Sequence, residues 1–193
     1  MPTTTYFNLS SQKRQRIEDA VKKEFARVPL IDMSVKNIVN DASIARGSFY
    51  QYFETREDLI NYMLGKEFDK ESENFLKILQ ESNKDIFKAT YEYLVQILDK
   101  QKNNSSYYIN IFQYLNETKI QPLKMIDIDN ISEYVNFKLL RISSKEEIYA
   151  AVRVIATLTF SKKMEILNGN ISKEEGLKQY AQELEVIKRG IVK

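Results

Sequence analysis

The sequence predicts an all-α protein of about nine helices, with a small N-terminal domain followed by a larger helical bundle. Helix breakers are rare, since the 193 residues include only 5 Gly and 3 Pro. Apolar residues recur three and four positions apart in successive blocks, which is the spacing of amphipathic helices. Hydrophobic residues make up 43% of the chain and charged residues 29%, a balance typical of folded globular proteins.

The first third of the chain predicts four helices, most of them with a start or stop signal. Pro29 ends the first helix, and Ser34 is the expected N-cap of the second. Thr55, with Asp58 three positions later, forms a capping-box-like pair at the start of the fourth. The expected ranges are about 11–28, 34–42, 46–52 and 55–79.

The remaining two-thirds of the chain predicts five more helices. Pro122 stands where a first-turn proline is tolerated, and Ser144 with Glu147 forms a capping box. A second such pair begins at Ser172, after a C-terminal stop at Gly169. The expected ranges are about 86–98, 108–115, 122–139, 144–167 and 172–187. We place the domain boundary between the third and fourth helices, which gives domains of residues 1–54 and 55–193.

The residue types that are missing exclude most enzyme chemistry. The chain has no Cys and no His, so disulfides, thiolate nucleophiles, imidazole bases and zinc sites built on these residues are excluded. We expect no cofactor and no metal. Carboxylate chemistry is the remaining possibility, but Glu146-Glu147 and Glu174-Glu175 both lie at helix starts, where capping and the helix dipole explain them. We therefore do not expect an enzyme.

The charge distribution and the chain ends indicate a compartment and, weakly, a partner. Residues 1–56 hold nine Lys/Arg against six Asp/Glu, a net charge of +3, and the remainder has a net charge of −1. A basic N-terminal part suits nucleic acid. Residues 1–11 are polar, unlike a secretory signal, and the best apolar run, 150–160, is short and contains Arg153. We expect a cytoplasmic protein with no membrane span.

The most informative segment is residues 34–53, in which two short helices are joined by a tight turn. Helices so arranged must share one buried corner. The side chains expected there are Ile38, Val39, Ala42, Ile44 and Phe49. The residues left on the outward side are Arg46, Gly47, Ser48, Tyr50, Gln51 and Tyr52. A guanidinium, hydroxyls and an amide with little aliphatic bulk suit phosphates and base edges, so the segment predicts a DNA-binding helix-turn-helix.

This segment resembles the TetR family of transcriptional regulators. The resemblance covers about residues 10–66 and includes the opening of the fourth helix at 55–59. The matching positions are Ala42, Ile44, Gly47, Ser48, Phe49, Tyr50, Tyr52 and Phe53. Two positions depart from the family pattern: Ser43 replaces the usual turn glycine, so a left-handed backbone there would be strained. Ala45 stands where the family has a capping residue and cannot cap the third helix.

The resemblance implies roles for individual side chains in DNA binding. Arg46 is the best candidate for contact with a base edge, and Gln51 is the second. Lys36 would reach a base or a phosphate, and Gly47 would let the backbone approach a DNA strand closely. Hydrogen bonds to phosphate would come from Ser48, Tyr50, Tyr52 and Arg56. An alternative without DNA contact, ordinary packing or simple exposure to solvent, remains open for Tyr50, Gly47, Lys36 and Arg56.

The resemblance also implies how the body of the protein works. The last two helices would pair with their symmetry mates in a homodimer, which binds a palindromic double-stranded operator. Close helix approach would be permitted by Ala150, Ala151, Ala156 and Ala181. The middle helices would hold a small-molecule effector, apolar or aromatic, and a cation would also suit an aromatic lining. The candidate lining residues are Tyr91, Tyr93, Tyr108, Phe112, Tyr134, Phe137 and Phe160.

Two hypotheses follow for the function. The first is a dimeric repressor that a small-molecule effector releases from its operator. The alternative is a DNA-binding structural or interaction protein that recruits a partner and has no effector. The helix-turn-helix is common to both, so it does not separate them.

Overall fold

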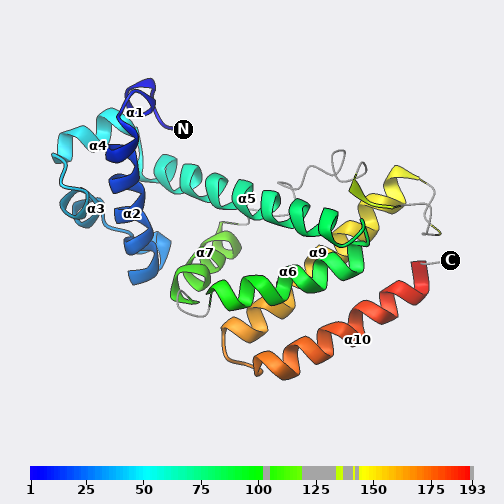
Figure 1. Ribbon diagram of the computed structural model, residues 1–193. Helices are drawn as coiled ribbons and strands as arrows, with labels where there is room; N and C mark the ends of the chain where they lie inside the picture. The colour runs from blue at the N-terminus through cyan, green and yellow to red at the C-terminus, as the bar shows by residue number, and fades with distance from the viewer. Residues whose placement is uncertain (102–104, 119–133, 137–140, 142–143, 192–193) are drawn as a thin grey trace. The chain divides into compact units, whose positions relative to one another are not determined.

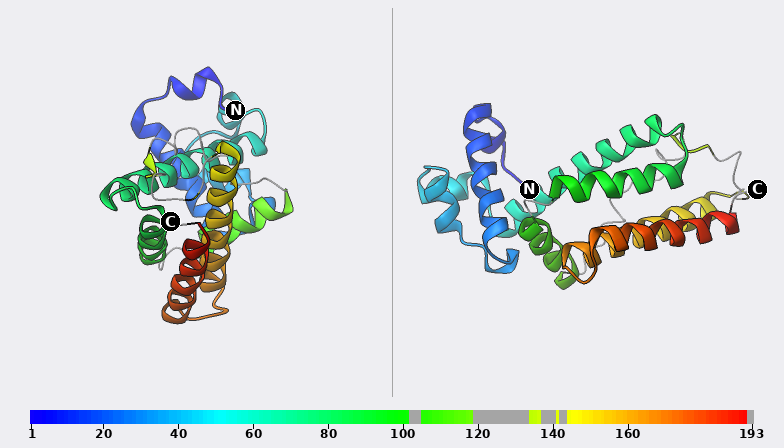
Figure 2. Two further views of the ribbon diagram at one scale, coloured as in Figure 1. Left: turned by 90° about the vertical axis from the view of Figure 1, so that its right-hand side faces the viewer. Right: turned by 60° about the horizontal axis from the view of Figure 1, so that its bottom comes forward.

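The structure is a computed structural model that describes residues 1–101, 105–118, 134–136, 141 and 144–191. In this part of the chain all regular structure is helical, which confirms the predicted fold class, and it comprises nine α-helices and one 3-10 helix (Figures 1 and 2). None of the helices described is long and apolar enough to cross a membrane. The chain forms two compact units, Met1–Asp69 with Asn104–Ile120, and Lys70–Asn103 with Gln121–Lys193.

The first unit contains the predicted helix-turn-helix and two short elements that the sequence did not predict, α1 (Thr4–Phe7) and the 3-10 helix η1 (Leu30–Asp32). Its other elements are α2 (Ser11–Arg27), α3 (Val35–Asp41), α4 (Arg46–Tyr52), the first part of α5 (Arg56–Glu81) and α7 (Ser105–Glu117). α2 packs against α3 and α7. The short helix α1 was not predicted because its residues look polar, yet Tyr6 within it is completely buried.

The helix boundaries of the first unit follow the signals in the sequence. α2 ends two residues before Pro29, as expected from the missing amide hydrogen of proline. The capping pair of α5 is confirmed: the Asp58 N–H donates to Thr55 Oγ1 at 3.0 Å, and the Thr55 N–H donates to Asp58 Oδ2 at 3.2 Å. Ser34 is the N-cap residue of α3, but its side chain makes no capping hydrogen bond.

The second unit contains α6 (Ile86–Gln101), α9 (Lys145–Leu167), α10 (Lys173–Ile191) and the rest of α5. The capping box of Ser144 and Glu147 is confirmed. Gly169, after α9, has φ +73°, the left-handed conformation expected of a helix stop. The helix predicted over 122–139 lies outside the described residues apart from 134–136.

α9 and α10 pack against each other through buried polar groups as well as apolar ones. The hydroxyls of Thr159 and Tyr180 are 2.7 Å apart. Lys162 is 3% exposed, and its Nζ lies 2.9 Å from Glu165 and 3.2 Å from Glu183. Burial alone lowers the pKa of Lys162, but these two carboxylates raise it above the ordinary value, so the lysine stays charged between the helices.

Candidate DNA-binding surface

The predicted corner between α3 and α4 is buried. Ile38, Ala42 and Phe49 are completely inaccessible to solvent, and Val39 is 4% exposed. Ala42 is the C-cap of α3, and its small side chain lets the two helices meet. Ile44, in the turn, is partly buried and packs against the same core. The corner set that the sequence predicted is therefore confirmed.

Both departures in the turn have the consequences expected of them. Ser43 has φ +54°, a left-handed conformation that is unfavourable for a residue with a Cβ. Ala45 is the N-cap of α4 and makes no side-chain hydrogen bond. The turn keeps its geometry because the buried corner holds it, and the Ile44 N–H donates to Val39 O at 3.0 Å.

The outer surface of the helix-turn-helix consists of side chains from α3 and α4. Five of these residues are exposed and one is partly buried. We call them the recognition face: Lys36, Arg46, Gly47, Tyr50 and Gln51 are exposed, and Ser48 is partly buried. Among the described residues, no hydrogen bond or ion pair ties the side chain of Lys36, Arg46 or Gln51 to another part of the chain. These polar groups are therefore available to a partner.

A purely structural role in packing was left open for Tyr50 and Gly47, and the structure bears on both. Tyr50 is 50% exposed and contacts Phe49 edge-on, at 5.2 Å between ring centroids, so it is not a fully buried packing residue. A Cβ added at Gly47 would meet no atom within 4 Å. Internal packing therefore does not require glycine at this position, and the close approach of an outside partner remains as a reason.

Tyr52 was predicted to face outward, and this prediction is wrong. Its side chain is 4% exposed and packs within the core of the first unit, 6.3 Å from the ring of Tyr6. The Lys13 Nζ lies over its ring at 5.6 Å. The sequence did not indicate this burial, because the cover comes from residues of α1 and α2 that are distant in the chain.

Arg56 is engaged within the chain rather than free to meet a phosphate. Its Nη1 donates to Ile31 O at 2.8 Å and to Met33 O at 3.4 Å. Its Nε and Nη2 donate to the Glu57 carboxylate at 3.2 and 3.0 Å. The guanidinium thus ties the start of α5 to the segment between α2 and α3, and binding a phosphate would compete with these bonds.

A buried carboxylate that the sequence analysis missed supports the helix-turn-helix from behind. Glu24 of α2 is 3% exposed. It accepts two bonds from Arg27, at 2.8 and 2.7 Å, one from the Ser34 N–H at 2.9 Å, and one from Asn37 Nδ2 at 3.3 Å. Burial alone raises the pKa of Glu24, but these donors lower it below the ordinary value. By accepting the Ser34 N–H and the Asn37 side chain, Glu24 anchors the start of α3 to α2.

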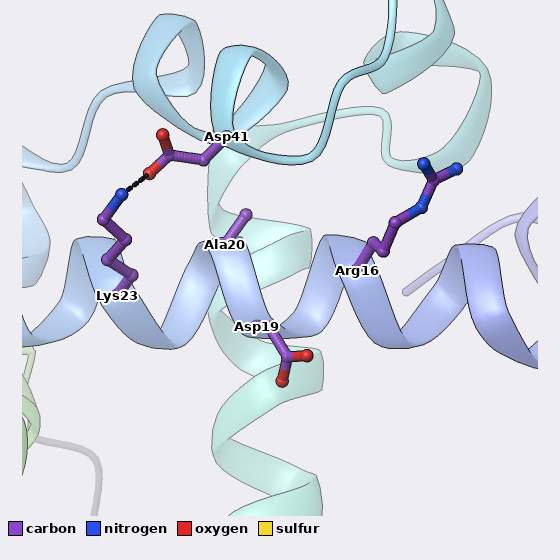
Figure 3. Close-up of a pocket in the computed structure, with 5 residues that line it drawn as sticks. All are labelled: Arg16, Asp19, Ala20, Lys23 and Asp41. Atoms are coloured by element: carbon purple, nitrogen blue, oxygen red, sulfur yellow. Dashed lines mark ion pairs between the residues drawn. The ribbon is translucent and has the colours of Figure 1, made fainter.

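A shallow depression in the first unit lies between α2 and α3. It is lined by Arg16, Asp19, Ala20, Lys23 and Asp41, and has a volume of about 260 Å³ (Figure 3). Lys23 and Asp41 form an ion pair of 2.9 Å across it, while Arg16 and Asp19 point away from that pair. Its two cations are balanced by two carboxylates, so it lacks the net positive charge that an anion site needs.

The candidate effector residues divide between the two units. Tyr91, Tyr93, Tyr134 and Phe160 are partly buried residues of the second unit, and Tyr108 and Phe112 are partly buried residues of α7 in the first. Phe137 lies outside the described residues. The ring of Tyr91 stacks on buried Tyr180 at 6.3 Å, so packing explains at least part of its position.

The sequence analysis missed two charged groups of the second unit, Glu71, which bonds to Tyr93, and Lys163. The Tyr93 hydroxyl donates to Glu71 Oε2 at 2.5 Å. Burial lowers the pKa of Lys163, and the Glu71 carboxylate opposes that shift. Neither group could be found from the sequence, because each belongs to an ordinary amphipathic helix. In the part of the chain that is described, no group of three or more acidic side chains could hold a metal ion.

The fold and the recognition face define a helix-turn-helix protein, and two family models identify the family to which it belongs. The model described as bacterial regulatory proteins of the tetR family matches residues 17–63. The model described as the tetracyclin repressor-like C-terminal domain matches residues 85–191, more than half of the chain. The chain belongs to the TetR family. Both models describe domains of regulatory proteins and not of enzymes.

Individual relatives agree with this assignment. An HTH-type transcriptional regulator of Staphylococcus aureus (strain USA300) is 27% identical over 89 residues, 45% of this chain, and the matched segment spans only about half of that relative (48%). A putative TetR-family regulator from Mesorhizobium loti has a similar fold, with a TM-score of 0.68 at 11% identity over 95% of this chain and 98% of that one. NalD of Pseudomonas aeruginosa has a TM-score of 0.65 at 18% identity over 94% and 96% of the two chains.

Proposed function

We propose that this protein is a homodimeric repressor that binds a palindromic operator through its recognition face and is released by a small-molecule effector. The observation that carries the proposal is the contrast at the corner of α3 and α4. The apolar residues there are buried, while polar groups such as Arg46 and Gln51 are exposed and not tied to the rest of the chain. Repression is the activity given for the structural neighbour NalD, the secondary repressor of a multidrug efflux pump.

The proposed DNA contacts follow the exposed side chains. Arg46 and Gln51 would contact base edges, and Lys36 would contact a base or a phosphate. Ser48 and Tyr50 would donate hydrogen bonds to phosphates. We assign DNA binding to residues 1–54, and ligand binding and dimerisation to residues 55–193. This functional division differs from the compact units, since α7 packs against α2.

Dimerisation is proposed through the outer faces of α9 and α10. Three of the strongly exposed large apolar side chains of the molecule lie on these helices: Tyr149 at 45%, Val154 at 52% and Val186 at 70%. Ala150 and Ala181 are exposed on the same helices and would permit close approach. A two-fold dimer would set the recognition helices about 34–36 Å apart, one turn of DNA.

Release by an effector is proposed as a shift between conformers. α5 belongs to both compact units, so a change in the second unit can be passed along it to the first. The effector must bind the released conformer more tightly than the DNA-binding one. The partly buried Tyr91 and Tyr93 suit an aromatic or cationic molecule, and the Glu71 carboxylate lies at the Tyr93 hydroxyl. A ligand that binds the chain and leaves operator affinity unchanged would contradict this step.

The DNA-binding proposal is tested by selecting duplexes from a random pool with the full chain and then measuring the affinity of Arg46→Ala. We expect enrichment of a two-fold symmetric sequence. Arg46→Ala should weaken binding to it by about 1–3 kcal/mol and relax the preference at one base pair in each half-site. Binding to unrelated DNA should change much less.

Arg141→Ala is the matched control, since Arg141 is an exposed arginine outside the first unit. It should bind the selected duplex as wild type does. If the chain enriches no sequence, or if Arg46→Ala binds like wild type, the recognition face has been assigned wrongly.

A further inference from the structure

The N-terminal segment of the chain closes over the C-terminal end of the recognition helix α4. The Thr3 hydroxyl donates to the carbonyl oxygen of Gln51 at 2.6 Å. The Thr3 backbone N–H donates to the carbonyl oxygen of Tyr52 at 2.9 Å. These bonds join residues that are 48 and 49 positions apart, so they are tertiary contacts and not part of a local turn. Figure 1 shows α1 beside α4.

These bonds meet a need that α4 cannot meet by itself. The last four carbonyls of any α-helix have no partner within the helix. In α4, the Phe53 N–H donates to Phe49 O at 2.9 Å, and Thr3 supplies partners for the carbonyls of Gln51 and Tyr52. No glycine with positive φ ends this helix, since Phe53 is extended with φ −137°. Thr3 therefore does the work that a local C-cap would otherwise do.

An aromatic anchor fixes the segment that carries Thr3. Tyr6 is completely buried, with its ring 4.9 Å from Phe53 and 6.3 Å from Tyr52. Its hydroxyl donates to Glu18 of α2 at 3.1 Å, and Lys66 of α5 holds the same carboxylate at 2.6 Å. Burial raises the pKa of Tyr6, so the hydroxyl remains a donor. The segment is thus attached to α2 and α4 directly, and to α5 through the Glu18 carboxylate that Lys66 also binds.

We propose that Thr3 is a positioning residue for DNA recognition, which fixes the C-terminal end of α4 and so the direction of the Gln51 side chain. Thr3 need not touch DNA for this role. It restrains the backbone of a residue that is proposed to contact a base, so its loss should reduce the preference for the correct sequence more than the affinity for DNA in general. The DNA part of this inference rests on the proposed function, but the restraint on α4 does not.

The test replaces Thr3 with valine, which keeps the shape and the backbone N–H but removes the hydroxyl donor. The first readout, the native-state hydrogen exchange rate of the Phe53 amide, needs no DNA. Loss of the bond from the Thr3 hydroxyl to Gln51 O should let the end of α4 open more often, so this rate should rise about 2- to 10-fold, as expected for one lost hydrogen bond. Amides of α2 should exchange as in wild type. The second readout is affinity for the duplex selected by the wild-type chain, divided by affinity for a scrambled duplex. This ratio should fall by about 2- to 10-fold.

Two further variants separate positioning from general stability. Thr3→Ser keeps the donor and should restore both readouts. Thr4→Val changes the adjacent exposed threonine and should alter neither. The inference is overturned if Thr3→Val leaves the Phe53 exchange rate unchanged, or if the rate rises while the specificity ratio stays that of wild type. If the wild-type chain selects no duplex but the Phe53 rate still rises, the proposed function fails while the restraint on α4 stands.

Discussion

The outer face of α4 and the outer faces of α9 and α10 expose different kinds of surface. α4 presents mainly polar groups, among them Arg46 and Gln51, on a helix of only seven residues. α9 and α10 are 23 and 19 residues long and expose Val154 and Val186. A short polar helix suits a hydrated, charged partner, and long helices with exposed apolar side chains suit another protein surface. The difference agrees with the proposal that the two surfaces bind different partners, DNA at α4 and a second copy of the chain at α9 and α10.

The buried polar groups behind the two surfaces also differ. In the first unit, Glu18 and Glu24 of α2 connect elements that are far apart in the sequence, such as α1, α3 and α5. In the second unit, Lys162 connects only the neighbouring helices α9 and α10. Because α2 supplies the polar anchors of the first unit, α4 does not need its outward side chains for stability.

The largest expected effect is on the carboxylate behind the helix-turn-helix. Glu24→Ala removes the acceptor for Arg27, the Ser34 N–H and Asn37, and should lower the free energy of unfolding by about 2–4 kcal/mol. Urea denaturation followed by circular dichroism measures it. Asp19→Ala on the same helix is the control. Asp19 is exposed, and among the described residues its side chain bonds only to Gln15, so its loss should cost at most about 0.5 kcal/mol.

The same carboxylate predicts a pH dependence of stability. The donors around Glu24 keep its pKa in the folded state below the ordinary value of 4.5. The stability it contributes is therefore complete above about pH 4.5, and is lost as the pH falls below that value. Glu24→Gln, which cannot titrate, should lose less stability than wild type between pH 5 and about 3. Equal losses in the two proteins would mean that the carboxylate is not the anchor described.

Much of the fold could be predicted from local sequence signals. Caps and stops at Thr55, Ser144 and Gly169 are each decided within four residues, and all three were predicted correctly. The corner of α3 and α4 was also predictable, since its apolar spacing is tied to a turn of fixed length. Ser43 stands where the family pattern has a turn glycine, and its positive φ agrees with that resemblance.

The sequence analysis missed contacts between residues that are distant in the chain. Tyr52 is buried because Tyr6 and Lys13 cover it, and Arg56 is engaged because the carbonyls of Ile31 and Met33 lie within its reach. The spacing of α4 alone puts Tyr52 near its outer side. The burial of Tyr6 depends on packing against the rest of the first unit, so it could not be predicted from the polar segment 1–9 alone. The exposed side chains of the recognition face were therefore predictable from each helix alone, whereas the contacts of the flanking residues Tyr52 and Arg56 were not.

The next effect tests the apolar side of the comparison. Val154→Glu puts a charge on the outer face of α9, where the side chain is 52% exposed, so the protomer should fold normally. The dimer proposed through α9 and α10 would have to bury that charge, and its dissociation constant should rise by at least about 100-fold. Light scattering coupled to gel filtration, over a range of concentrations, measures this change.

The matched control for this variant is Gln96→Glu, which changes an exposed residue of α6 in the same unit. It adds the same charge away from the proposed interface and should leave the oligomeric state unchanged. A dimer that persists in Val154→Glu, or a wild-type protein that is monomeric at all concentrations, would mean that the exposed valines serve another purpose.

The smallest expected effect has opposite signs in folding and in binding, and it tests the polar side of the comparison. Gly47→Ala adds a methyl group that meets no atom within 4 Å, and alanine favours a helix, so the free energy of unfolding should rise by about 0.5–1 kcal/mol. Binding to the selected duplex should weaken by about 1 kcal/mol or more, because the methyl group would stand where a DNA strand approaches α4. Gly65→Ala in α5 is the matched control, since its added methyl group also meets no atom. It should stabilise the chain similarly and bind DNA as wild type does. If Gly47→Ala gained stability without losing affinity, the partner would not approach α4 at this position, and the polar surface would have to be used in a different orientation.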